Sequence, residues 1–153
     1  MKKIIGVILA TIIFTIIIII LSQHVMPSSG LYPFKRVYEK VILLTKRTPQ
    51  KKADYTRQLL IERLIELDNT YTSSDGYLIL STNLRYSTTA GDLANLIQSN
   101  HLITEVSPTD QLFNNQIKYI STIRSHHPNI SNKYLDDDIH YLELYKQQIN
   151  KLK

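Results

Sequence analysis

The stretch that decides the fold is residues 48–71, TPQKKADYTRQLLIERLIELDNTY, where a helix start signal precedes apolar residues at helical spacing. Thr48 is a favourable N-cap, and Pro49 suits the first helical turn because its missing N–H is not needed there. One apolar stripe follows, formed by Ala53, Leu60, Leu64, Leu67 and Tyr71 and flanked by Ile61 and Ile65. This periodicity predicts an amphipathic helix that ends near Asn69 or Tyr71 and needs other helices to cover its apolar side.

A shorter helix is predicted upstream, and a longer one downstream. The upstream helix starts at Pro33 and has one apolar and one charged side. Its apolar stripe is Phe34, Val37, Tyr38, Val41, Ile42 and Thr45, and its other face is Lys35, Arg36, Glu39 and Lys40. The downstream helix is capped by Ser74 and runs from about Asp75 to Ser99; the strand-like run at residues 77–80 fits it equally well.

Gly91 is the irregular residue of that longer helix. A glycine inside a helix costs about 1 kcal/mol relative to alanine. Close approach of a second helix at Ala90, Gly91 and Ala94 is one reason to keep it. A break of the helix at this point is the alternative.

Two more helices are predicted in the rest of the chain. Ser107-Pro108-Thr109-Asp110 is a start signal for a helix that ends at His126 or His127, before a proline. The last helix follows Asn132 and has residues 136–138, all aspartate, in its first turn, where carboxylates suit the positive end of the helix dipole. These patterns predict an all-α fold, with an exterior bundle of four or five helices over residues 33–153.

The N-terminal segment predicts a membrane anchor. Residues 4–21 carry no charge, and these 18 residues span about 27 Å as a helix, against a hydrocarbon core of about 30 Å. Lys2 and Lys3 assign residues 1–3 to the cytoplasm by the positive-inside bias. The remainder, a linker at residues 22–32 and the helical domain, is then extracytoplasmic.

An uncleaved signal anchor is favoured because the apolar run is longer than that of a cleaved signal. Cleavage is the alternative, because Ser28 and Gly30 have the small-residue pattern of a cleavage site, although they lie nine residues beyond the run. With an uncleaved anchor the cytoplasmic part is three residues, so an inward signal would need a partner protein.

The helical domain also resembles a known family in its first half. Leu31-Tyr32-Pro33-Phe34-Lys35-Arg36 precedes a basic, leucine-rich helix that contains Glu62-Arg63-Leu64-Ile65-Glu66-Leu67, and residues 85–91, RYSTTAG, follow. These segments resemble a bacterial membrane-anchored extracytoplasmic domain family of unknown function, over about residues 27–98. The resemblance implies a helical hairpin outside the membrane and assigns no catalytic residue.

Composition excludes several kinds of site. The chain has 153 residues and no cysteine, which excludes disulfides, cysteine zinc sites, iron–sulfur clusters and thiol nucleophiles. It has no Gly-x-Ser-x-Gly or His-Glu-x-x-His motif. Glu62 and Glu66 lie one helical turn apart, but Arg63 beside them favours a solvated surface over an acid–base pair.

Charge is unevenly distributed along the chain. Residues 35–63 hold nine Lys/Arg and three Asp/Glu, whereas residues 64–153 hold seven and ten. The basic part follows the predicted anchor, where each basic residue near an anionic surface contributes about 1 kcal/mol. The basic part, residues 35–63, could therefore face lipid headgroups or an anionic wall polymer. The alternative is an ordinary solvated helix face. Aromatic residues are not interleaved with it, so nucleic acid is not an expected partner.

One metal site is a candidate. Asp136 and His140 are four residues apart on the last helix, a spacing that can chelate a metal, and His126 with His127 would complete the ligand set. In the alternative, the aspartates stabilise the helix start and the histidines are exposed turn residues. The alternative is favoured, so no metal or cofactor site is assigned.

Tyrosine is abundant, with ten residues against three phenylalanines and no tryptophan. Tyr134, Tyr141 and Tyr145 on the last helix either form a contact surface or pack the helix into the bundle, and packing is favoured. We therefore expect a non-catalytic, membrane-tethered extracytoplasmic module for protein interaction or envelope sensing. Its partner would be a membrane or envelope protein or a second copy. The alternative is a metal- or ligand-binding envelope sensor using the Asp136/His140 cluster.

Overall fold

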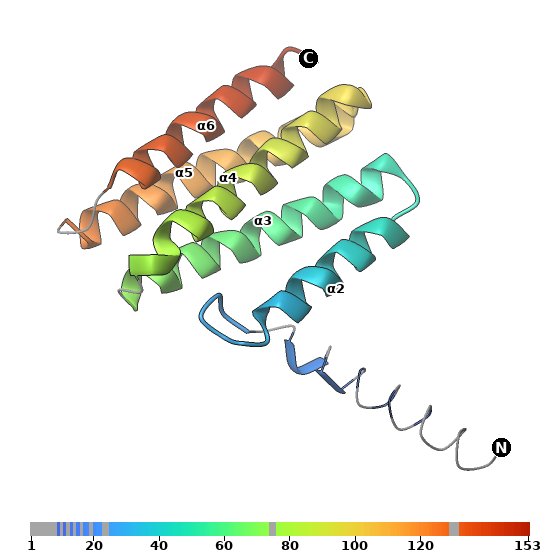
Figure 1. Cartoon of the computed structure of the whole chain (residues 1–153). Helices are drawn as coiled ribbons and strands as arrows, with labels where there is room; N and C mark the ends of the chain where they lie inside the picture. Colours follow the sequence, from blue (N-terminus) through green and yellow to red (C-terminus); the bar gives the residue numbers. More distant parts are fainter. Residues whose placement is uncertain are drawn as a thin grey trace. The chain divides into compact units, whose positions relative to one another are not determined.

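The computed structural model describes residues 9, 11, 13, 15, 17, 18, 20–22, 25–73, 76–128 and 132–153. All regular structure in these residues is helical, which confirms the predicted all-α class. The helices that follow residue 31 are α2 (Tyr32–Thr45), α3 (Pro49–Thr72), α4 (Gly76–Ser99), α5 (Ile103–His126) and α6 (Lys133–Asn150) (Figure 1). The Thr48 hydroxyl accepts the Lys51 N–H at 3.3 Å, so Thr48 is the N-cap of α3 as predicted.

The predicted anchor, residues 4–21, and the predicted tip, residues 1–3, lie mostly or wholly outside the described residues. In the described part of the chain, no helix combines the length and the apolar character needed to cross a membrane. The predicted cap Ser74 also lies outside the described residues. The anchor and this cap therefore stay predictions.

The chain divides into two compact units, residues 1–45 and residues 46–153. α2 belongs to the first unit. The second unit is a four-helix bundle of two helical hairpins, α3 with α4 and α5 with α6 (Figure 1). The hairpins pack with α4 beside α6 and α3 beside α5, so the bundle encloses its core between two layers of two helices.

Each bundle helix presents a seam with alternating spacings of three and four residues, the spacing of packed helices in coiled coils and bundles. The α3 and α4 seams are Ala53, Thr56, Leu60, Arg63, Leu67 and Thr70, and Ile79, Asn83, Tyr86, Ala90, Leu93 and Ile97. The α5 and α6 seams are Val106, Thr109, Phe113, Gln116, Ile120 and Ile123, and Leu135, Asp138, Leu142, Tyr145 and Ile149. All are buried except the partly buried Tyr145, so the seams form the core.

Gly91 lies within an unbroken α4, so the alternative of a helix break at this residue is wrong. A Cβ atom at Gly91 would lie 2.8 Å from the Tyr145 hydroxyl oxygen and 3.1 Å from the ring carbon that carries it. Glycine therefore makes room for the Tyr145 ring of α6. The contact at Gly91 is therefore with a side chain of a second helix, which is a packing reason to keep glycine here.

The predicted start of α5 is wrong by one turn. α5 begins at Ile103, and Pro108 lies inside it, where it removes one backbone hydrogen bond. The added turn brings Leu102 and Val106 into the core and sets Glu105 near the positive end of the helix. Glu105 also pairs with Arg57 of α3. These contacts offset the lost hydrogen bond, a long-range effect that the local start signal does not contain.

The apolar stripe predicted for α2 lies largely outside the core. Phe34, Val37 and Val41 are exposed, whereas Lys35 and Glu39 are buried. A helical pattern predicts that one side is apolar, but not which side becomes covered. α2 therefore presents an apolar face to the surroundings.

We predict that the substitution Gly91→Ala couples to the side chain at position 145. Alanine gains about 1 kcal/mol of helix propensity, but its methyl group meets the Tyr145 ring. In a Tyr145→Leu background, Gly91→Ala should stabilise the protein by at least about 1 kcal/mol more than in the native background. Denaturant unfolding of the detergent-solubilised full chain measures this difference. Gly76→Ala, whose Cβ meets nothing within 4 Å, should show no coupling; additivity at Gly91 would contradict the packing.

Candidate functional site

Arg63 and Glu66 form a buried ion pair on α3, which corrects the prediction of a solvated surface there. They are 0% and 1% exposed, whereas Glu62 is exposed as predicted. Arg63 occupies the seam between Leu60 and Leu67, so helical phase directs it inward despite its charge. Pairing with a carboxylate is what makes a buried guanidinium tolerable.

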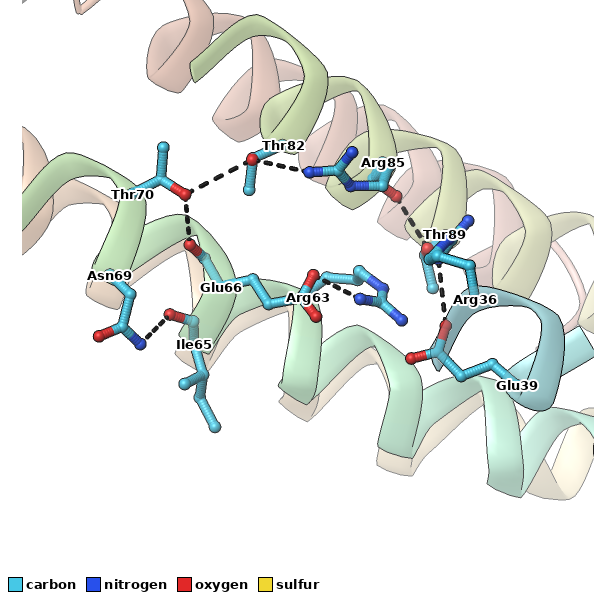
Figure 2. A network of polar contacts seen from close by, with 10 residues as sticks. All are labelled: Arg36, Glu39, Arg63, Ile65, Glu66, Asn69, Thr70, Thr82, Arg85 and Thr89. Atoms are coloured by element: carbon cyan, nitrogen blue, oxygen red, sulfur yellow. Dashed lines mark hydrogen bonds and ion pairs between the residues drawn. The ribbon is translucent and has the colours of Figure 1, made fainter. Parts of the chain in front are cut away.

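A hydroxyl network extends from this pair to α4. The Thr70 hydroxyl donates to the Glu66 carbonyl at 2.8 Å and lies 3.5 Å from the Thr82 hydroxyl (Figure 2). Arg85 donates to the same Thr82 oxygen at 2.9 Å. Polar groups therefore connect α3 to α4 along one side of their seam.

A second buried polar group, Asp138, lies in the α6 seam between Leu135 and Leu142 and is 2% exposed. Burial, followed by repulsion from Asp137, raises the pKa of Asp138 from 3.8 to about 8, against a lowering hydrogen bond from the Ser87 hydroxyl. Its Oδ2 atom has no hydrogen-bond partner among the described residues. Near neutral pH the carboxyl group is therefore mostly protonated.

Buried polar side chains of the other three helices form a set that includes two tyrosines influenced by the Asp138 charge. The Tyr86 hydroxyl donates to Gln116 Oε1 at 2.7 Å and so joins α4 to α5. Asn83 Nδ2 donates to the Ile79 carbonyl at 2.7 Å and lies 3.4 Å from the Tyr71 hydroxyl of α3. Burial raises the pKa of Tyr71 and Tyr86, and the negative charge of Asp138 contributes to both shifts. We call Tyr71, Asn83, Tyr86, Gln116 and Asp138 the polar core.

The polar core can hold a proton, but it is closed to solvent. Its five side chains are all buried. A substrate would have to open the bundle to reach Asp138, so the geometry suits a structural, pH-dependent role more than catalysis. The sequence pattern contained a signal for this role, because Asp138 is the one residue of the run 136–138 that falls in phase with Leu135 and Leu142.

The candidate metal ligands Asp136, His140, His126 and His127 do not form a cluster in the described part of the chain. The described residues contain no group of three or more His, Cys, Asp or Glu side chains that could hold a metal ion. Asp136 instead pairs with Arg124, whose Nε lies 3.1 Å from Asp136 Oδ1. His140 lies beside Tyr141, His127 beside Tyr71, and His126 is exposed.

The three tyrosines of α6 divide between packing and surface. Tyr134 and Tyr145 pack against the core, as the favoured prediction had it. Tyr141 is exposed and stacks on Tyr145, with the ring centroids 6.3 Å apart. The stacked pair of Tyr145 and Tyr141 therefore reaches from the core to the surface of the bundle.

Apolar side chains are exposed on α4 and α6, which pack side by side. Tyr77, Leu80 and Leu84 of α4 are 77%, 57% and 63% exposed, and Tyr141 of α6 is 43% exposed. We call these four residues the outer α4–α6 face. On α4 they recur at spacings of three and four residues, on a different side of the helix from the seam. This is a second apolar stripe.

An open depression of about 330 Å³ lies at the start of α3. Lys46, Lys51, Asp54, Tyr55 and Gln58 line it, and the Lys46 ammonium lies 5.3 Å from the centre of the Tyr55 ring. Its lining offers one carboxylate and two ammonium groups on exposed or half-buried side chains, and none of the lining residues is fully buried. It lacks the features of an enclosed ligand site.

Comparison with known protein families identifies a match. Residues 24–133 match the family described as Domain of unknown function (DUF5667), and this range includes all of α2–α5 and the first residue of α6. No curated protein and no solved structure shows significant similarity to the chain. The comparison therefore agrees with the expected resemblance to a family of unknown function.

We predict that the stability of the bundle falls between about pH 4 and pH 8. Folded Asp138 keeps its proton up to about pH 8, whereas unfolded Asp138 loses it near its ordinary value of 3.8, so the folded state binds more protons in this window. Stability should fall by up to about 1.4 kcal/mol per pH unit and level off above pH 8.

Asp138→Asn should remove this slope and stabilise the full chain by at least about 2 kcal/mol at pH 8. Denaturant unfolding of the detergent-solubilised protein over this pH range measures both effects. Asp137→Asn is the matched control, because Asp137 is exposed and should leave most of the slope in place. An identical slope in the Asp138→Asn variant would contradict the assignment.

Proposed function

Because the chain belongs to the family Domain of unknown function (DUF5667), whose description assigns no activity, we propose its function from its own residues. We propose a membrane-tethered, extracytoplasmic and non-catalytic helical module whose outer α4–α6 face binds a protein partner in the membrane or envelope. The observation that carries this proposal is the exposure of Tyr77, Leu80, Leu84 and Tyr141 on two adjacent helices.

The chemistry of the outer α4–α6 face fits a protein surface. Two leucines supply apolar area, and two tyrosines supply rings with a polar end, a residue type enriched at the centre of protein interfaces. Such residues, gathered on one face, are uncommon on a monomer without a partner. Binding of a protein partner would remove this apolar area from water, and this burial would contribute hydrophobic free energy to binding.

Enzymatic and metal-sensing functions receive less support. The carboxyl group with the strongly raised pKa, Asp138, is sealed in the core. Asp136 is paired with Arg124, which competes with metal coordination. Neither arrangement resembles a cleft with accessible acid and base groups.

Support for the tether comes from sequence alone. The uncharged run at residues 4–21 and the lysines Lys2 and Lys3 indicate a single span with the helical domain outside. An anchored domain needs only modest affinity for a partner in the same membrane, because tethering raises the effective concentration of both proteins.

The absence of cysteine allows a direct test of this topology. In intact cells, a membrane-impermeant maleimide should label the variant Lys118→Cys and should not label Lys3→Cys until the membrane is opened. Labelling of Lys3→Cys in the full-length chain after opening would show that the anchor is uncleaved. The reverse labelling pattern would contradict the proposed orientation.

Site-specific photo-crosslinking tests the partner surface. With a photoreactive residue at position 84 of the full chain in its native membrane, we expect a discrete adduct with another protein, identified by mass spectrometry. The matched control is position 65, because Ile65 is an exposed apolar residue of α3, at 50% exposure. No adduct should form from position 65.

The substitution Leu80→Ser should lower the yield of the position-84 adduct by about tenfold, which corresponds to about 1.4 kcal/mol of binding free energy. Ile61→Ser on α3 should change it by less than about twofold. An adduct only with a second copy would contradict a heterologous partner. Equal labelling of many proteins from both positions would contradict a specific face.

A further inference from the structure

α2 presents an apolar face that neither the bundle seams nor the outer α4–α6 face accounts for. Phe34, Val37, Val41 and Leu44 are 49%, 62%, 51% and 80% exposed, and they recur at spacings of three, four and three residues. Residues at these spacings share one side of a helix. The face is therefore a continuous apolar strip along a helix of 14 residues.

The polar side of α2 is basic, and so is the chain that follows it. Residues 35–52 contain seven Lys or Arg residues and one acidic residue, Glu39. Arg36 pairs with Glu39 at 3.2 Å, whereas Lys40 is exposed and borders the apolar strip by its place in the helical turn. An apolar strip with a basic border is the pattern of helices that lie in the plane of an anionic membrane.

α2 also begins close to the predicted membrane exit. Ten residues separate Leu21, the end of the predicted anchor, from Tyr32, the start of α2. The chain turns within this segment, where the Ser29 N–H bonds the Met26 carbonyl at 2.9 Å and the Tyr32 N–H bonds the Ser29 carbonyl at 3.0 Å. Ten residues reach at most about 35 Å even when fully extended, so the anchor would keep α2 near the membrane surface.

We propose that α2 is an interfacial helix that lies along the outer surface of the anchoring membrane. Phe34, Val37, Val41 and Leu44 insert among the acyl chains, and Lys40 contacts anionic lipid headgroups. The inference rests on the tether of the proposed function and adds a second membrane contact to it. It does not depend on the partner of the outer α4–α6 face.

A lipid surface fits this strip better than a second copy of α2. Two copies would bury four apolar side chains each over a helix about 21 Å long, which is short for a stable two-helix contact. The excess of basic residues would also oppose pairing, whereas it favours an anionic surface. The charge of the segment therefore selects the membrane as the occupant.

Tryptophan fluorescence provides the test, since the chain has no native tryptophan. The full chain carrying Phe34→Trp is reconstituted into vesicles of phosphatidylcholine with phosphatidylglycerol, with and without brominated acyl chains. We expect blue-shifted emission and at least twofold quenching by the brominated lipid. The matched control is Ile65→Trp, because Ile65 and Phe34 are equally exposed, at 50% and 49%; it should not be quenched.

A second comparison tests the role of charge. In vesicles of phosphatidylcholine alone, or with the added substitution Lys40→Glu, quenching of the tryptophan at position 34 should decrease. If neither the removal of the anionic lipid nor the substitution Lys40→Glu reduces the quenching, the headgroup contact is overturned. The substitution Val37→Asp, on the apolar strip, should reduce the quenching as well, and no reduction would overturn insertion of this strip.

The remaining outcomes separate this inference from the proposed function. Blue-shifted but unquenched emission at position 34 would place the strip against protein and overturn the membrane contact alone. Protein that floats with the vesicles and shows no difference between positions 34 and 65 would do the same. A chain that does not float with the vesicles would contradict both the tether and the interfacial helix.

Discussion

The bundle depends on four seams that repeat every seven residues and contain polar side chains at regular places. On α3, the apolar column Ala53, Leu60 and Leu67 alternates with the polar column Thr56, Arg63 and Thr70. Gln116 on α5 and Asp138 on α6 occupy equivalent seam positions. On α3, half of the seam positions are therefore polar, so this seam buries less apolar area than a purely hydrophobic one. The polar groups restrict register, because a shifted helix would leave Arg63 or Asp138 in the core without its partner.

The packing of the core also determines which apolar side chains remain exposed, and these exposed side chains form the proposed partner surface. The hydrogen bond of Ser87 with Asp138 and the contact of Gly91 with Tyr145 hold α4 beside α6. Leu80 and Leu84 of α4 and Tyr141 of α6 are exposed on these two adjacent helices. The proposed partner surface is thus a consequence of the core packing. The α2 strip, in the other unit, is a separate apolar surface with a basic border, which suits a different occupant.

The sequence predicted most of the helices because their signals are local. Thr48 and Pro49 set the start of α3, and Asn132 precedes α6, as the spacing of capping and apolar residues indicated. The start of α5 was missed because Leu102 and Val106 become buried only through contacts with distant helices. Burial of Arg63 and Glu66 was not predicted, because charged side chains on a helix are usually solvated. The position of Arg63 in the seam between Leu60 and Leu67 places it in the core despite its charge. The exposure of the α2 strip could not be predicted, since amphipathicity shows that a helix has an apolar side without identifying what covers it.

The candidate site was predictable only in part for the same reason. The spacing of Asp136 and His140 suggested a metal site, but the ion pair of Asp136 with Arg124 depends on how α6 packs beside α5. Burial raises the pKa of Asp138 to about 8, and its position in phase with Leu135 and Leu142 was visible in the sequence. The sequence does not show how many helices pack around position 138, and that packing causes the burial that raises the pKa of Asp138.

The central claim, that the polar seams join α3–α6 into one cooperative unit separate from α2, is tested most directly by hydrogen exchange. Mass spectrometry of the full chain in membrane vesicles would follow exchange in peptides from each helix as denaturant is added. We expect the seam amides of all four bundle helices to exchange with one common free energy of opening, and the amides of α2 to exchange independently of them. Separate opening of the α3–α4 and α5–α6 hairpins would contradict it.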